Sequence, residues 1–233
     1  KYMKKIIAFG AHPDDVEFGV GGLLIKEIKN GNKVKIVIGS LGEAGSNGTP
    51  ASRKKEAQDA AKFIGAEIEF INLGGDCHIE NNPKNVIKVA EIIREYQPNI
   101  VLAPSLAENQ HPDHKNVAEM VRSACRYARY GGLKEIIKTK THNIDALFYY
   151  PSSAEIDKKP DIIIDVTAEY DAWAQAMSMH KSQMKTRGYI NLVTSKARAV
   201  GASVGVEYAT VLWVNDPIRL EGLSDLKVSS RNY

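Results

Sequence analysis

The stretch Ile6-Ile7-Ala8-Phe9-Gly10 is a short apolar run that ends at a polar loop, Ala11-His12-Pro13-Asp14-Asp15. Beyond this loop, apolar residues recur every three or four positions, at Val16, Val20, Leu23, Leu24 and Ile28. The run has the length and composition of a buried strand, and the spacing after it is that of one face of a helix. A strand followed directly by such a helix predicts an α/β fold.

The same alternation continues along the first half of the chain. Apolar runs predict three further buried strands, at 34–38, 68–73 and 100–104. Between and after them, helical spacing predicts one helix that ends at Gly65 and another over 115–130. Thr49 before Pro50, and Asn82 before Pro83, are typical of helix starts.

The second half is less regular. It contains three further predicted strands, at 146–150, 162–166 and 206–214, and two predicted helices, at 168–181 and 189–200. The whole pattern predicts one domain over residues 1–233. Its core is a Rossmann-like, open and mostly parallel sheet flanked by helices, with a C-terminal part that closes over the functional site.

The composition excludes several classes of protein. The chain has 233 residues, 43% hydrophobic and 25% charged, and its 31 basic and 28 acidic residues are mixed rather than grouped, which argues against a dedicated nucleic-acid-binding protein. No apolar run reaches the length of a membrane span. Two cysteines, Cys77 and Cys125, are too few for a disulfide framework and favour a reducing, cytoplasmic compartment.

Two loops are rich in metal-ligand side chains. His12-Pro13-Asp14-Asp15 follows the first predicted strand, and His111-Pro112-Asp113-His114 follows the fourth. Ligands of open parallel sheets bind at the carboxyl ends of the strands, where these loops should meet. A single His-Pro-Asp segment is more often only a turn, but two copies favour a site. Imidazole with carboxylate, and no cysteine, predicts catalytic Zn²⁺.

Nucleotide-binding motifs do not fit the chain. Gly19, Gly21 and Gly22 resemble part of a dinucleotide fingerprint, but Leu24 stands where that motif needs a small residue. The sequence also contains no Gly-Lys-Ser or Gly-Lys-Thr triplet, so a phosphate-binding P-loop is excluded.

Five segments resemble the PIG-L and LmbE-like family of N-acetylglucosaminyl deacetylases. They are the two histidine loops at 12–15 and 111–114, Gly42-Glu43-Ala44-Gly45, Ser52-Arg53-Lys54-Lys55-Glu56 and Gly205-Val206-Glu207-Tyr208-Ala209. The resemblance spans most of the chain. It implies a zinc-dependent hydrolase that removes acetate from an N-acetylglucosamine-type sugar.

The resemblance also implies the roles of the loop residues. His12, Asp15 and His114 would hold the zinc ion, while Asp14 stays unligated as the general base beside the bound water. Such a base removes the proton of the attacking water, which zinc makes more acidic.

Three further roles concern the substrate carbonyl and the leaving amine. His111 would stabilise the developing oxyanion or act as the acid for the amine, and Asp113 would orient the ring of His111. Hydrolysis of an amide needs this proton donor because an amine is a poor leaving group.

Four more residues are candidates for binding the sugar. Arg53, Glu43 and Asp76 would read its hydroxyl or carboxylate groups, and Tyr189 would approach it from a C-terminal loop. Arg53 could instead be an exposed cation, Asp76 part of a simple turn, and Tyr189 a packing residue at a helix start. The remaining histidines lack partners at metal spacing and are predicted to be surface or partly buried polar groups, namely His78, His142 and His180.

The resemblance leaves the exact substrate open. Ser46-Asn47-Gly48-Thr49 and the chain length are similar to the members that deacetylate N-acetylglucosaminyl malate in bacillithiol synthesis. Free or chitin-derived sugars, glycolipid head groups and a non-catalytic sugar- or metal-binding protein are the alternatives. Relatives often form trimers or hexamers, so a homo-oligomer is expected.

Overall fold

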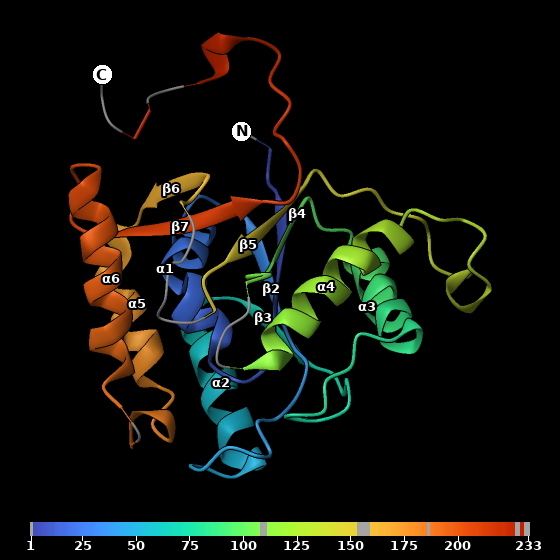
Figure 1. Ribbon diagram of the computed structural model, residues 1–233, viewed down its shortest axis with the longest axis horizontal. Coiled ribbons are helices and arrows are strands. Elements are labelled where there is room, and N and C mark those ends of the chain that lie inside the picture. The colour runs from blue at the N-terminus through green and yellow to red at the C-terminus, as the bar shows by residue number, and fades with distance from the viewer. Residues whose placement is uncertain (1, 108–110, 153–158, 186, 227–228, 231–233) are drawn as a thin grey trace.

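The computed structural model describes residues 2–107, 111–152, 159–185, 187–226 and 229–230. Its sheet has the strand order β3-β2-β1-β4-β5-β7-β6 (Figure 1). The strands are β1 (Lys5–Gly10), β2 (Lys33–Ile38), β3 (Glu67–Phe70), β4 (Ile100–Pro104), β5 (Ala146–Tyr150), β6 (Ile162–Asp165) and β7 (Ala209–Val214). The first five run parallel, whereas β7 is antiparallel to both β5 and β6. The predicted α/β fold with a mostly parallel sheet is confirmed.

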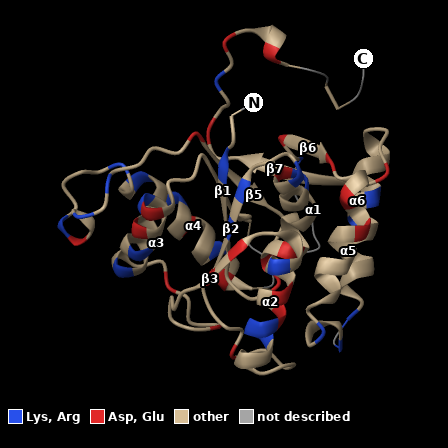
Figure 2. Cartoon of the chain, turned by 180° about the vertical axis from the view of Figure 1, so that it is seen from behind, with Lys and Arg blue, Asp and Glu red and all other residues tan. Residues whose placement is uncertain are grey.

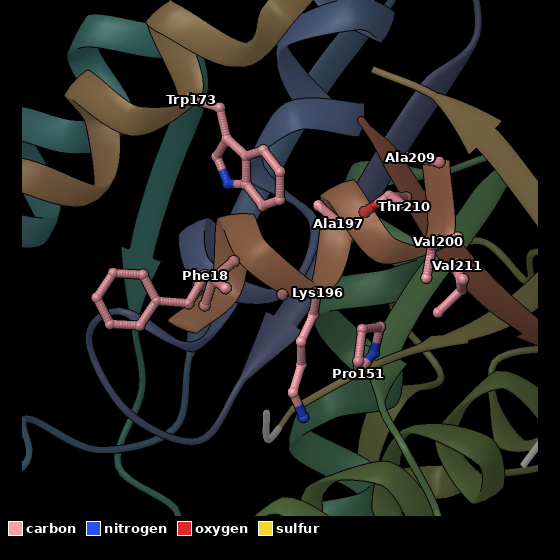
Figure 3. A pocket seen from close by; sticks show the side chains of 11 residues that line it. Phe18, Pro151, Trp173, Lys196, Ala197, Val200, Ala209, Thr210 and Val211 are labelled. Carbon is pink, nitrogen blue, oxygen red and sulfur yellow. The ribbon is translucent and has the colours of Figure 1, made fainter. Parts of the chain in front are cut away.

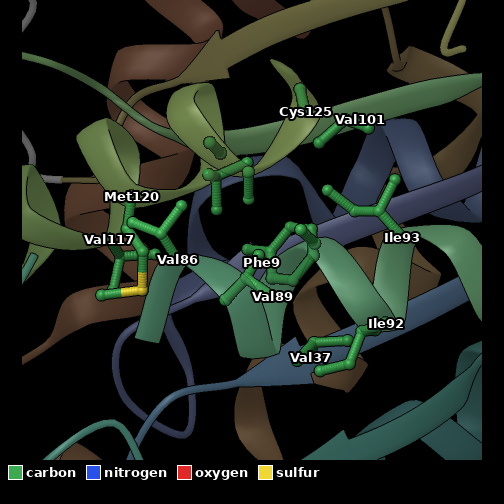
Figure 4. Packing of buried hydrophobic residues seen from close by; sticks show 14 of the residues in the cluster. Phe9, Val37, Val86, Val89, Ile92, Ile93, Val101, Val117, Met120 and Cys125 are labelled. Atoms are coloured by element: carbon green, nitrogen blue, oxygen red, sulfur yellow. The ribbon is translucent and has the colours of Figure 1, made fainter. Parts of the chain in front are cut away.

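Helices cover both faces of the sheet (Figure 1). They are α1 (Asp15–Lys29), α2 (Pro50–Ile64), α3 (Pro83–Tyr96), α4 (Pro112–Tyr127), α5 (Tyr170–Ser178) and α6 (Tyr189–Ser203). Helices α3 and α4 pack on one face through a core that includes Phe9, Val89 and Val117 (Figure 4). On the other face, α1, α2, α5 and α6 bury Val20, Trp173 and their neighbours. Removing this apolar surface from water is the main force that holds the layers together.

The helix starts predicted at proline are confirmed. The Thr49 side chain accepts a hydrogen bond from the backbone N–H of Ser52, and the Asn82 side chain accepts one from that of Asn85. The helix predicted over 115–130 begins earlier, at Pro112, because proline at the first helical position loses no hydrogen bond.

Two predicted elements near the C-terminus are shorter than expected. The helix predicted over 168–181 covers only Tyr170–Ser178. After it the hydrogen bonding changes to the tighter pattern of a 3₁₀ turn, in which the N–H of His180 donates to the carbonyl of Met177, three residues back. The strand predicted from 206 begins at Ala209, since Gly205 has a φ of 78° and the N–H of Val206 caps α6 at Gly201.

Charged side chains are spread over the surface. Figure 2 shows Lys and Arg interspersed with Asp and Glu on the helices. None of the helices in the described ranges is both long and apolar enough to cross a membrane.

Candidate active site

The first histidine loop is fixed by Asp15 at the start of α1. Its Oδ2 accepts hydrogen bonds from the backbone N–H groups of Ala11 (2.8 Å) and His12 (2.9 Å). Its Oδ1 lies 3.1 Å from Nε2 of His114, which belongs to the first turn of α4. Because β1 and β4 are neighbours in the sheet, their carboxyl ends bring the two loops together, as predicted.

His12, Asp15 and His114 form a buried cluster that could hold a metal ion. Each residue offers a ligand atom, and these atoms lie within 4.8 Å of one another. Nδ1 of His12 faces Asp15, at 3.6 Å from Oδ2. Two imidazoles and one carboxylate are a donor set that Zn²⁺ accepts in catalytic sites.

The other nitrogen of His12 faces two carboxylates. Nε2 lies 3.1 Å from Oδ1 of Asp76 and 3.2 Å from Oδ2 of Asp113. Burial lowers the pKa of His12, but hydrogen bonds to Asp113, Asp15 and Asp76 outweigh it and raise the pKa to about 12. A metal-binding histidine typically donates the N–H of its non-ligating ring nitrogen to a carboxylate. Nε2 of His12 is placed to do this, which leaves Nδ1, on the side of Asp15, to bind a metal in place of a proton.

Asp113 contacts more than the ring it was expected to orient. Its Oδ2 is 3.8 Å from Nδ1 of His111 but 3.2 Å from Nε2 of His12, and it accepts a hydrogen bond from the backbone N–H of Cys77 (2.8 Å). The geometry therefore gives Asp113 its shorter contact with His12. The loop after β3, which carries Cys77, is the third wall of the site.

Asp14 lies beside the cluster but not in it. Its backbone has a φ of 119°, and its Oδ2 is 3.5 Å from Nη2 of Arg53. Burial, and then the charge of Asp15, raise the pKa of Asp14 to about 6, although Arg53 and His180 oppose the shift. A carboxylate whose pKa lies close to neutral is suited to accept a proton.

Arg53 is buried and does not extend from α2 into solvent as an exposed cation would. Its Nη1 donates to the carbonyl of Gly42 (3.1 Å) and its Nη2 to that of Pro13 (3.0 Å). Gly42 has a φ of 69°, and a Cβ there would lie 1.8 Å from Nη1. Glycine at this position thus lets Arg53 tie the loop after β2 to the first histidine loop.

The other candidate sugar ligands, Asp76, Glu43 and Tyr189, differ in burial and in their contacts. Asp76 is buried against His12, and its Oδ2 accepts a hydrogen bond from the N–H of Ala44 (3.1 Å). Exposed Glu43 accepts one from the N–H of Asp76 (3.0 Å). Tyr189 is half-buried at the start of α6, where its ring stacks on Phe18 at 5.9 Å.

The prediction that His180 is a surface or partly buried group is wrong. His180 and Glu17 are each only 1% exposed, and Nε2 of His180 lies 3.6 Å from Oε2 of Glu17. Burial lowers the pKa of His180, but the carboxylates of Glu17, Asp14 and Glu56 raise it more, so the net shift is upward. The pair joins α1 to the turn after α5. No local motif in the sequence indicates this ion pair.

The His180–Glu17 pair should make stability depend on pH. In His180→Gln a buried carboxylate loses its cation, which we expect to cost about 3 kcal/mol in the free energy of unfolding. Because folding raises the pKa of His180, its contribution is fully present below the unfolded pKa of about 6.5 and is lost as pH rises through the folded pKa. Urea unfolding at several pH values measures this.

A matched control is available at His78, which is exposed. His78→Gln should leave the urea midpoint unchanged at each pH. If His180→Gln is as stable as the unaltered chain at acidic pH, the pair does not contribute to folding.

The turn after α5 also contacts α2 and the loop before it. Ser182 donates to Glu56 through both its N–H (2.9 Å) and its hydroxyl (2.6 Å). Gln183 donates from its side chain to the carbonyl of Asn47 (3.2 Å). The C-terminal part of the chain thus supports the elements that carry Arg53 and Asp14.

An apolar pocket lies between α1, α6 and β7 (Figure 3). Trp173 and Val211 contribute to its walls, and Lys196 is the charged side chain among its described lining residues. The lining residues include no group of metal ligands, in contrast to the histidine cluster.

Comparisons with known proteins identify the family of the chain. The family described as "PIG-L: GlcNAc-PI de-N-acetylase" matches residues 7–125, just over half of the chain. A 4-oxalmesaconate hydratase of Pseudomonas putida is 26% identical over 72% of this chain and 69% of its own. A diacetylchitobiose deacetylase of Thermococcus kodakarensis is 26% identical over 78% of this chain and 70% of its own.

A solved structure supports the fold. The crystal structure of a conserved protein of Thermus thermophilus superimposes with a TM-score of 0.83 at 27% identity, and the match covers 94% of this chain and 97% of that one. The family match spans both histidine loops, from before His12 to beyond His114. The chain belongs to the PIG-L family of de-N-acetylases, enzymes that hydrolyse an amide.

Proposed function

We propose that this protein is a zinc-dependent deacetylase that hydrolyses the acetamide of an N-acetylglucosamine-type sugar. The observation that carries the proposal is the convergence of His12, Asp15 and His114, with the second nitrogen of His12 bonded to carboxylates. Zinc, when bound there, supplies a Lewis acid that polarises the acetamide carbonyl and acidifies water.

The residues around the cluster supply the proton transfers. Asp14, whose side chain is 13% exposed, accepts the proton of the attacking water. His111 is 32% exposed on the side of the loop after β3, where it can donate to the departing nitrogen or to the developing oxyanion. Arg53 ties the loop after β2 to the first histidine loop and orients Asp14. Asp113 and Asp76 orient His12.

For the substrate, we propose N-acetylglucosaminyl malate first and a chitin-derived sugar second. The loop over 46–49 supports the first, by its likeness to the malate-specific members. The diacetylchitobiose deacetylase relative supports the second. Glu43 is exposed beside Asp76 and is the candidate to bind a sugar hydroxyl, and Tyr189, which stacks on Phe18 of α1, is a second candidate to contact the sugar.

A hydratase is the second candidate function. It is favoured by the similarity to the 4-oxalmesaconate hydratase, which is as close in identity as the deacetylase relative. The same general base would then assist the addition of water to a carbon–carbon double bond, and no acetate would be released. Loss of the ultraviolet absorbance of 4-oxalmesaconate, a conjugated tricarboxylate, would reveal this activity.

Removing the metal tests the deacetylase. We expect the purified protein to release acetate from one of the two N-acetylated sugars, to lose this activity after dialysis against a chelator, and to regain it with one equivalent of Zn²⁺. Acetate is measured by a coupled assay, with glucosamine derivatives that lack the acetyl group as blanks. Turnover that persists without metal would contradict the zinc proposal.

The protein is also proposed to form a homo-oligomer in a reducing, cytoplasmic compartment. After β7 the chain runs away from the sheet (Figure 1) and exposes apolar side chains, among them Leu223 and Leu226. Such residues are candidates for contact with a second copy. Light scattering after gel filtration would give the number of copies, expected to be three or six.

A further inference from the structure

The turn after β3 places a thiol next to His111. Gly74 and Gly75 have φ angles of 130° and 94°, and Cys77 itself has a φ of 65°. The backbone N–H of Cys77 is held by Asp113, so the turn is fixed to the start of α4. The exposed thiol of Cys77 therefore lies at the open side of the site and does not point away from it.

Three donor atoms meet at this point. Sγ of Cys77 is 3.5 Å from Oδ1 of Asp76 and 3.8 Å from Nε2 of His111, and the latter two atoms are 3.4 Å apart. Asp76 and His111 adjoin the cluster of His12, Asp15 and His114: with His12 and Asp113 they form a group whose ligand atoms lie within 4.8 Å of one another, and the His111 ring is 4.3 Å from that of His12. Cys77 adds a thiol on the open side of this group.

The triangle has the size of one face of a tetrahedral zinc site. With metal–ligand bonds of about 2.0–2.3 Å, tetrahedral ligands are separated by about 3.3–3.6 Å. The three observed distances are within a few tenths of this range without any movement of the chain. Thiolate, imidazole and carboxylate are also the three donor types that Zn²⁺ uses in proteins.

We propose that Asp76, Cys77 and His111 form a second binding site for a thiophilic divalent cation such as Zn²⁺, and that its occupancy inhibits the enzyme. When the ion binds, the Cys77 thiol releases its proton to solvent and the sulfur forms the new bond. Nε2 of His111 becomes a ligand and can no longer exchange a proton with the substrate. The inhibition, though not the binding, rests on the proposed function.

The proton on sulfur must be displaced by the metal. Desolvation and the Asp76 carboxylate raise the pKa of Cys77, so the free thiol keeps its proton at neutral pH. Binding at the second site therefore requires displacement of this proton. Because His12, Asp15 and His114 are buried whereas Cys77 is exposed, we expect the first equivalent of metal to fill the buried cluster and excess metal to fill the second site.

The experiment is a titration of the metal-free protein with Co²⁺, followed by absorbance, and with Zn²⁺, followed by calorimetry. Thiolate bound to Co²⁺ gives a near-ultraviolet charge-transfer band that imidazole and carboxylate ligands do not give. This band should develop only with the second equivalent. In Cys77→Ser the band should be absent and the affinity for the second Zn²⁺ should fall by about tenfold or more.

Cys125→Ser is the matched control. Cys125 is the other cysteine and lies on the buried face of α4, so its replacement should keep the band and both equivalents. A single equivalent bound by the unaltered protein, or a band that persists in Cys77→Ser, would overturn the site. Both results are independent of any deacetylase activity.

The inhibition is measured separately, in an activity assay. Acetate release by the unaltered protein should rise up to one equivalent of Zn²⁺ and fall by about tenfold with excess, whereas Cys77→Ser should lose this fall. Equal inhibition of both proteins would overturn the regulatory part. If no substrate is turned over but the Co²⁺ band appears, the proposed function fails and the second site stands.

Discussion

Asp14→Asn is expected to lower turnover by about 10²–10⁴-fold while the protein keeps its metal. Asp14 is outside the cluster of metal ligands, but it is a partly buried carboxylate next to it, and desolvation raises its pKa to about 6. An asparagine amide has the same shape and cannot accept the proton of water. Asparagine also tolerates the positive φ of this residue better than most side chains.

Two measurements separate the role of Asp14 from that of a ligand. Acetate release gives the loss of turnover, and elemental analysis of the purified variant gives the bound zinc. Full activity would place the base elsewhere in the site. Loss of zinc would instead make Asp14 a ligand.

Asp15→Asn is expected to lose the metal, with an affinity for Zn²⁺ that falls by about 100-fold or more. One carboxylate oxygen accepts two backbone hydrogen bonds and the other faces His114, so both oxygens are used. The amide nitrogen of asparagine cannot replace either role, because it is a donor. Turnover should fall with the metal content, and added Zn²⁺ should restore part of it.

The result is measured as zinc per chain after gel filtration and as the rise in melting temperature on adding Zn²⁺. His111→Ala is the control, since it should keep the first zinc ion and lose only turnover. If His111→Ala loses that zinc ion and Asp15→Asn retains it, the two roles assigned to these residues are exchanged.

The sheet was predictable because the first half of the chain has strong local signals. The runs at 6–10 and 100–104 are apolar throughout and the run at 34–38 is interrupted only by Lys35, as is typical of central parallel strands, and the ends of the strands brought the two histidine loops together. The direction of β7 was not predictable, because hydrophobic pattern does not tell a parallel strand from an antiparallel one. It depends on how α6 returns to the sheet.

Within the site, the motif residues were found and two of their partners were missed. Cys77 could have been included, since it follows a strand of the same sheet and a pair of glycines. His180 could not, because its partner Glu17 is 163 positions away in the chain, and nothing local signals a buried ion pair. Arg53 was expected to face the substrate, but its buried contacts with backbone carbonyls could be seen only in three dimensions.

The contacts that α1 and β1 make with the second half of the chain determine the minimum length of a working enzyme of this type. Trp173 donates to the carbonyl of Glu17 (2.7 Å) and the Tyr150 hydroxyl donates to that of Phe9 (2.6 Å), so β1 and α1 are bonded to residues that lie beyond the family match. A fragment ending near residue 125 would keep the histidines and aspartates of both histidine loops, but the apolar face of α1 would be exposed to water. The smallest autonomous catalyst must therefore extend at least through the turn that contains His180.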